Sequence, residues 1–221
     1  MAARSTVERV PTPVGDGRLF LDEAADSGPV LMLGHGAGGG VGAFDLAELA
    51  ARLPERGVTV VRFEQPWRTA GRKVAVPPPR LDQAWTAAAR QLLDRLGPVS
   101  RLFFGGRSAG ARVACRTAPQ FDVTGVVCLS FPLHPPGRPE RSRAPELLGA
   151  GVPRLVIQGE RDTFGGPDEV RLAAQGENIR IIAVPGAGHG LGVAKSAPFS
   201  ASQVKQLIVD AVADFCLAPA P

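Results

Sequence analysis

The chain has 221 residues, of which 44% are hydrophobic and 21% are charged, so it can bury one substantial core. The formal net charge is +4, but the arginines are scattered singly and in pairs and do not cluster among aromatic residues. This distribution argues against a nucleic-acid partner and indicates a solvated surface. We therefore expect one domain over residues 1–221.

The sequence carries no signal for a membrane or for secretion. No apolar run approaches the roughly 20 residues that a membrane helix needs, and residues 1–5 lead into polar residues without an apolar segment. Cys115, Cys128 and Cys216 lack the spacing of metal ligands, so we expect reduced, buried thiols. These features predict a cytoplasmic protein without a metal or other cofactor, and they leave its oligomeric state open.

Strands and helices are predicted to alternate after an N-terminal hairpin. The hairpin comprises residues 6–11 and 18–21, around glycines at positions 15 and 17. Further strands are predicted at residues 29–33, 58–63, 101–105, 123–129, 153–158 and 179–184. Helices are predicted at residues 44–56, 81–96, 109–118, 167–174 and 200–215, the last with a capping box of Ser200 and Gln203.

Two longer segments interrupt this alternation. Residues 65–79 and 132–149 are rich in proline and are predicted to be irregular, with one helical turn at 145–148. The alternation itself predicts an α/β protein with a mostly parallel sheet and helices on both faces. Crossovers in such a sheet are right-handed, so the loops that follow its strands meet at one edge.

Residues 106–110 read Gly-Arg-Ser-Ala-Gly, a G-x-S-x-G pattern directly after a predicted strand. This pattern forms a sharp turn that lifts a serine hydroxyl above the strand end, with glycines where side chains would clash. The pattern alone is weak evidence in a chain with 27 glycines, because serine is also a common helix cap. It becomes specific when an acid and a histidine follow it in the right order.

Ser108, Asp162 and His189 occur in that order, and each follows a predicted strand. A serine hydroxyl needs a base to take its proton, and the base needs an acid to orient it. We predict that these three residues form a catalytic triad, with Glu160 as a weaker candidate for the acid. The alternatives are a turn aspartate and a loop histidine without a catalytic role.

The glycine-rich segment 34–40 follows another predicted strand and is expected to face the serine. The backbone N–H groups of Ala37 and Ala109 are predicted to form the oxyanion hole. His35 and Gly36 are expected at the substrate site, with His35 shaping the loop rather than acting as a base. The segment lacks the lysine and serine of a phosphate-binding P-loop.

Several basic side chains lie near the predicted site. Arg107 precedes the serine and is expected to contact substrate. Together with Arg68, Arg72 and Lys73 it would favour a carboxylate-bearing substrate, although solvated surface charge is the interpretation that we prefer. His134 is placed at the substrate site, with an exposed loop histidine as the alternative.

These motifs resemble those of the α/β-hydrolases from end to end. Within that superfamily the chain resembles a small, nearly lidless group similar to the testis-expressed-protein-30-like hydrolases, which is itself close to the dienelactone hydrolases. The matching segments are residues 34–38, 61–63 with Pro66, 71–73, 105–110, 131–137 and 158–165. The resemblance implies an α/β-hydrolase fold with a minimal or absent cap domain, and it puts the serine, aspartate and histidine at triad positions. Leu191 and Gly192 stand where this group usually has a larger aromatic residue.

The expected activity is hydrolysis of a carboxylic ester in a small-molecule acyl substrate. Only about two dozen residues separate Leu129 from Pro153, and they lack a convincing cap helix. An open site of this kind favours small or surface-presented acyl groups over long lipids. A non-catalytic interaction scaffold is the competing hypothesis, and acyl transfer or peptide cleavage by the same residues is a third.

Overall fold

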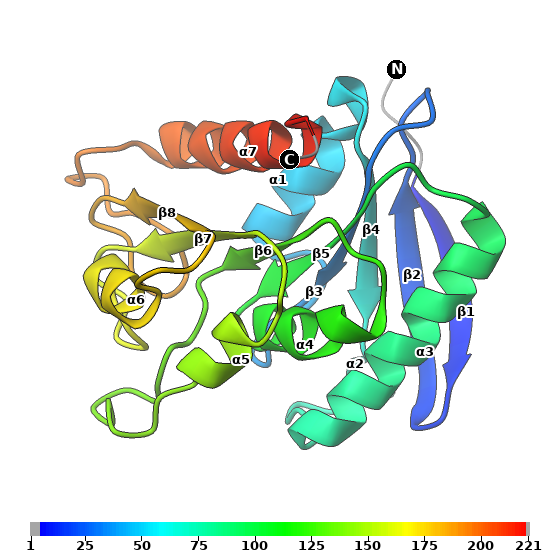
Figure 1. Ribbon diagram of the computed structural model, residues 1–221, viewed down its shortest axis with the longest axis horizontal. Coiled ribbons are helices and arrows are strands. Elements are labelled where there is room, and N and C mark those ends of the chain that lie inside the picture. Colours follow the sequence, from blue (N-terminus) through cyan, green and yellow to red (C-terminus); the bar gives the residue numbers. More distant parts are fainter. Residues whose placement is uncertain (1–4, 220–221) are drawn as a thin grey trace.

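The computed structural model describes residues 5–219, which fold around an eight-stranded sheet (Figure 1). The strands are β1 (Thr6–Thr12), β2 (Gly15–Asp22), β3 (Val30–Gly34), β4 (Thr59–Glu64), β5 (Leu102–Arg107), β6 (Gly125–Leu129), β7 (Arg154–Gly159) and β8 (Ile179–Val184). The order across the sheet is β1-β2-β4-β3-β5-β6-β7-β8. Strands β3 to β8 are parallel, whereas β1 and β2 form an antiparallel hairpin that joins β4, so the predicted mostly parallel sheet is confirmed.

Helices cover both faces of the sheet, as predicted. They are α1 (Phe44–Arg52), α2 (Pro66–Thr69), α3 (Pro78–Leu96), α4 (Ala109–Thr117), α5 (Ala144–Leu148), α6 (Pro167–Ala173) and α7 (Ala201–Leu217), with short 3₁₀ turns η1 (Pro54–Arg56) and η2 (Ala118–Gln120). Helices α1 and α7 lie together on one face, and α3, α4 and α5 lie on the other (Figure 1). No helix within residues 5–219 combines the length and the hydropathy that crossing a bilayer requires. Four of the N-terminal residues from which we expect no secretion signal, 1–4, lie outside the described range.

Each face of the sheet has its own apolar core. Beneath α3 and α4, the Trp85 indole packs edge-on against Phe63 and Phe104, with ring centroids 6.2 and 5.2 Å apart. Under α1 and α7, Leu46 and Ile208 are fully buried against the opposite face. Each such side chain stabilises the fold by about 1.5–3 kcal/mol relative to exposure. The two cores hold the parallel strands firmly, and with them the loops at the strand ends.

Proline explains where the element boundaries differ from the sequence prediction. The helix predicted at 44–56 ends at Arg52, because Pro54 has no N–H for the helical ladder, and the 3₁₀ turn η1 follows. The segment 65–79 is less irregular than expected, since α2 lies within it and α3 already begins at Pro78. The hairpin turns at residues 13–14, so Gly15 begins β2 with φ of 119°.

At the sheet edge where the parallel strands end, β3 is in direct backbone contact with the turn after β5. A Cβ atom on Gly110 would lie 2.2 Å from the carbonyl oxygen of Gly34, and one on Gly106 would lie 2.5 Å from the same oxygen. No side chain fits between these segments. The two glycines of the G-x-S-x-G pattern therefore have the steric role that the sequence indicates.

Candidate active site

Ser108 lies between the end of β5 and the first residue of α4, where the chain reverses direction. Its backbone has φ of 52° and ψ of −111°, a conformation that costs a non-glycine residue about 1–3 kcal/mol. The backbone N–H of Ser108 donates to the carbonyl of Leu129 on the neighbouring strand at 2.9 Å. The turn is thus tied to the sheet, and the hydroxyl stands above the strand end.

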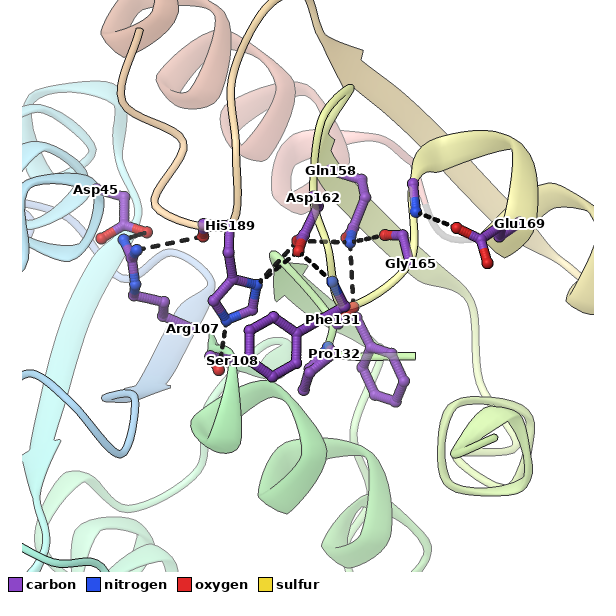
Figure 2. A network of polar contacts seen from close by, with 12 residues as sticks. Asp45, Arg107, Ser108, Phe131, Pro132, Gln158, Asp162, Gly165, Glu169 and His189 are labelled. Carbon is purple, nitrogen blue, oxygen red and sulfur yellow. Dashed lines mark hydrogen bonds and ion pairs between the residues drawn. The ribbon is translucent and has the colours of Figure 1, made fainter. Parts of the chain in front are cut away.

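Three side chains from different loops form a continuous hydrogen-bonded relay (Figure 2). The His189 Nε2 lies 2.9 Å from the Ser108 Oγ. On the other side of the ring, Nδ1 lies 2.8 Å from Oδ2 and 3.1 Å from Oδ1 of Asp162. This geometry requires the tautomer in which Nδ1–H donates to the carboxylate, leaving Nε2 to accept the serine proton.

The carboxylate of Asp162 is fixed by donors from its own loop and strand. The side-chain Nε2 of Gln158, at the end of β7, donates to Oδ2 at 2.9 Å and also contacts the carbonyls of Gly165 and Phe131 (Figure 2). The backbone N–H of Phe164 donates to Oδ1 at 2.9 Å. Since the carboxylate is fully buried, these donors replace the water that would otherwise solvate it.

An aromatic ring packs beside the imidazole. The Phe164 ring lies 4.3 Å from the His189 ring, centroid to centroid, with 34° between the planes. The resembling group usually has its large aromatic after the histidine, where this chain has Leu191 and Gly192. Here Phe164, from the aspartate loop, packs against the base. The sequence alone assigned no role to Phe164 or Gln158, although both lie in segment 158–165, which carries part of the family resemblance.

Arg107 joins the nucleophile turn to two other segments. Its Nη1 donates to Oδ2 of Asp45, on α1, at 2.9 Å, and its Nη2 donates to the backbone carbonyl of His189 at 3.3 Å (Figure 2). Burial raises the pKa of the fully buried Asp45 carboxyl, and the positive charge of Arg107 acts in the opposite direction. Asp45 was not predicted as part of the site. The only sign of it in the sequence is an acidic residue between two apolar positions of the predicted helix.

Two residues that line the cavity of Ser108 have backbone amides without an acceptor within residues 5–219. Ala109 is the first residue of α4, so its N–H has no acceptor within the helix. Ala37 lies in the glycine-rich loop after β3. Within residues 5–219 neither N–H donates a hydrogen bond, and both residues line the same cavity as Ser108. The pair can therefore donate to a negatively charged oxygen beside the nucleophile.

A cavity of about 690 Å³ opens above the relay. It is lined by Gly36, Ala37, Gly38, Gly39, Ala43, Phe44, Arg107, Ser108, Ala109, Arg112, Pro132, Arg143, Phe164, His189 and Gly190. The residues predicted to line a substrate site are thus divided. Gly36 and Arg107 do line the cavity, whereas His35 and His134 do not.

Both excluded histidines bind backbone elsewhere. His35 is buried, its Nε2 accepts from the N–H of Gln65 at 3.1 Å, and burial lowers its pKa, so the ring is neutral and shapes the loop. The His134 Nδ1 lies 2.9 Å from the Pro135 carbonyl, and its Nε2 lies 3.0 Å from Oε2 of Glu169. Their rings are therefore committed to loop structure.

The other charged candidates also lie apart from the relay. The Glu160 carboxylate accepts from the backbone N–H of Gly186 at 2.7 Å, so it does not take the place of Asp162. Arg68, Arg72 and Lys73 are exposed, and none of them lines the cavity of Ser108. In the part of the chain that the structure describes, no group of three or more His, Cys, Asp or Glu residues is arranged to hold a metal.

Comparison with known families agrees with this architecture. A family model described as an alpha/beta hydrolase domain matches residues 27–217, which is most of the chain. This chain belongs to the alpha/beta hydrolase family. The family and the fold implied by the sequence resemblance are both confirmed.

Solved structures of similar fold include several small hydrolases. An alpha-beta serine hydrolase homologue from Coxiella burnetii superposes with a TM-score of 0.72 at 16% identity, covering 93% of this chain and 96% of its own. A lidless serine hydrolase from Xanthomonas campestris gives 0.70 at 19% identity, with coverages of 99% and 98%. The protein Est1E from Butyrivibrio proteoclasticus gives 0.74 at 15% identity, with coverages of 96% and 98%. At these identities the likeness concerns the fold alone.

Proposed function

We propose that this alpha/beta hydrolase cleaves a carboxylic ester of a small-molecule acyl substrate through an acyl-enzyme on Ser108. The observation that carries the proposal is the uninterrupted relay from the serine hydroxyl through His189 to a buried carboxylate. All three groups are within hydrogen-bonding distance, as nucleophilic catalysis by serine needs. The two free amides beside the serine support the same proposal.

Acylation begins when the Ser108 Oγ attacks the acyl carbon and His189 Nε2 takes the hydroxyl proton. The carbonyl oxygen gains a negative charge, which the N–H groups of Ala37 and Ala109 stabilise. In other enzymes one such donor lowers the activation free energy by about 3–4 kcal/mol. The tetrahedral intermediate then expels the alcohol, and the imidazolium returns the proton to the leaving oxygen.

Deacylation repeats these steps with water as the nucleophile. His189 removes a proton from the water, the hydroxide oxygen bonds to the acyl carbon, and the Ser108 oxygen leaves with the proton that the imidazolium returns. Asp162 stays ionised and stabilises the imidazolium in both halves of the reaction. The open cavity supports small acyl groups, because the described chain contains no cap that would enclose a long aliphatic chain.

A fluorophosphonate probe tests this proposal directly, since it forms a covalent bond only with an activated serine. We expect the wild-type protein and Ser100→Ala to be labelled and Ser108→Ala to remain unlabelled. Ser100 is a matched control, because it precedes the same strand at its opposite end. Ester turnover, measured over a panel of acyl chain lengths, should fall by at least about 10³-fold in Ser108→Ala.

Two results would contradict the proposal in different ways. An unlabelled wild-type protein would favour an interaction scaffold that keeps the fold without the chemistry. A protein labelled at Ser108 that hydrolyses none of the esters would favour acyl transfer or peptide cleavage by the same relay.

A further inference from the structure

Arg143 stands out among the charged side chains of the cavity. It belongs to the short segment between β6 and α5, and it lines the cavity together with Ser108. Its Nη1 donates to the backbone carbonyl of Pro132 at 3.0 Å. Within residues 5–219 no carboxylate lies within 4 Å of its guanidinium, so its charge has no ionic partner.

The neighbouring cations are already neutralised. Arg112 forms a bidentate pair with Glu146, and the same carboxylate accepts from Arg116 at 2.8 Å. Arg116 also binds Asp82 through two nitrogens. The two carboxylates thus balance the charges of Arg112 and Arg116, and the positive charge of Arg143 is left in excess.

That excess charge faces the cavity. Of the other two arginines of the cavity wall, Arg107 is paired with Asp45 and Arg112 with Glu146. The Asp162 carboxylate is fully buried behind His189. Burial and the charge of Arg112 both lower the pKa of Arg143, an environment that a bound anion would relieve. A carboxylate fits the planar guanidinium well because it can accept two parallel hydrogen bonds.

We propose that Arg143 is the anion-binding residue of the substrate cavity and that the preferred substrates are esters carrying a free carboxylate, such as half-esters of short dicarboxylic acids. This inference rests on the proposed function, because it names the substrate class of the same site. The ester carbonyl lies at Ser108 and the Ala37 and Ala109 amides, and the second carboxylate binds Arg143 in the same cavity. Arg68, Arg72 and Lys73 have no part in this recognition.

The binding test uses the Ser108→Ala background, so it requires no turnover. Ligand-detected NMR compares monomethyl glutarate with methyl valerate, which has a methyl group in place of the carboxylate. We expect the half-ester to bind about tenfold more tightly, as one charge-assisted hydrogen-bonded pair predicts. Adding Arg143→Gln should remove the preference, Arg143→Lys should keep part of it, and Arg141→Gln, an exposed neighbour, should leave it unchanged.

The kinetic test measures kcat/KM for the same two esters by proton release. Arg143→Gln should lower the ratio of the half-ester kcat/KM to the neutral-ester kcat/KM by about tenfold, and Arg141→Gln should leave this ratio unchanged. Equal binding of both esters, or a preference that survives Arg143→Gln, would overturn the inference. Failure of the proposed function looks different: the wild-type protein would hydrolyse neither ester, while the binding preference would still be measured in the Ser108→Ala background.

Discussion

At the residue scale, Arg107 connects the turn that carries Ser108 to the loop that carries His189. It follows the last glycine of β5, yet its guanidinium bonds with Asp45 and with the backbone carbonyl of His189. The contact with Asp45 neutralises a buried charge, and the contact with the carbonyl holds the loop that presents the imidazole. From these two contacts we expect Arg107 to position His189 as well as to stabilise the fold. The two roles can be separated by experiment, because each depends on a different contact.

Arg107→Gln should lower the free energy of unfolding by about 3–5 kcal/mol, because Asp45 would keep a buried charge without its partner. The double variant Arg107→Gln/Asp45→Asn removes that charge and should regain most of the stability in urea denaturation. Its kcat should stay about tenfold below the wild-type value, since the donor to the His189 carbonyl is still missing and the base is less well placed.

Asp45→Asn alone is the matched control, because it keeps the donor to the His189 carbonyl. Its kcat should lie close to the wild-type value once the folded fraction is taken into account. A double variant with full kcat would assign Arg107 to the stability of the fold only.

The relay residues could be predicted from sequence because their positions depend on topology alone. Ser108, Asp162 and His189 each follow a parallel strand, and such strand ends meet at one edge. Phe164 and Arg143 could not be assigned in the same way. Their roles depend on which direction a loop side chain takes and on which neighbours are already paired, and neither follows from spacing.

At the element scale, the segment after β6 is joined to α6 by one polar pair. The His134 ring meets the Glu169 carboxylate, which also accepts from the backbone N–H of Gly166 and so caps the helix. The Pro135 carbonyl and, to a smaller degree, Glu169 raise the pKa of His134. The Gly166 N–H and the imidazole lower the pKa of Glu169.

These shifts define a pH window for the pair. The contribution of His134 is complete below its unfolded-state pKa, near 6.5, and is lost as the pH rises through the raised folded value. The contribution of Glu169 is present above its unfolded-state pKa, near 4.5, and is lost as the pH falls through the lowered folded value. The pair therefore stabilises the fold most between these two unfolded-state values.

His134→Gln should reduce the free energy of unfolding by about 0.5–1 kcal/mol more at pH 5.5 than at pH 8.5, because the imidazolium is charged only at the lower pH. Urea denaturation at the two pH values measures the difference. Glu169→Gln keeps a capping amide oxygen without the charge and should show a smaller pH dependence of the same sign, because the Pro135 carbonyl still raises the pKa of His134. An equal loss of unfolding free energy at both pH values would mean that the His134 side chain stabilises the fold by packing and not by its charge.

The predictability of the elements follows the strength of their local signals. Buried apolar strands and the Ser200 capping box were predicted to within a few residues, since composition and a cap define them locally. The break at Pro54 and the early start of α3 at Pro78 were missed. The apolar pattern of the first helix continues past the point where Pro54 ends its backbone hydrogen bonds, and the apolar pattern of α3 begins later than the helix itself. In both cases proline sets the boundary.

At the scale of the whole molecule, the three cysteines report on the two apolar cores. All three thiols are free and buried. Cys115 and Cys128 lie in the core beneath α3 and α4 with their sulfur atoms 3.6 Å apart, and their mutual hydrogen bond and burial raise the pKa of Cys128. Cys216 lies in the other core, where burial raises its pKa to about 12.

Because thiolates are the reactive form, the folded protein should react very slowly with Ellman's reagent at pH 8. All three thiols should react within minutes in about 6 M guanidinium chloride, a concentration above the unfolding midpoint of nearly all domains. At intermediate denaturant, the three should react together if the cores open cooperatively. Rapid labelling of one cysteine in the native protein would show that its core opens independently.

The backbone contact between Gly34 and Gly110 separates two properties that many enzymes combine in the same residues. The loop with Ala37 and the turn with Ser108 are spaced by main-chain atoms. Arg143, in the wall of the same cavity, belongs to the separate segment before α5 and forms no hydrogen bond with the three relay residues. Substitutions in that segment can therefore change which molecules bind in the cavity and leave the positions of the three relay residues as they are.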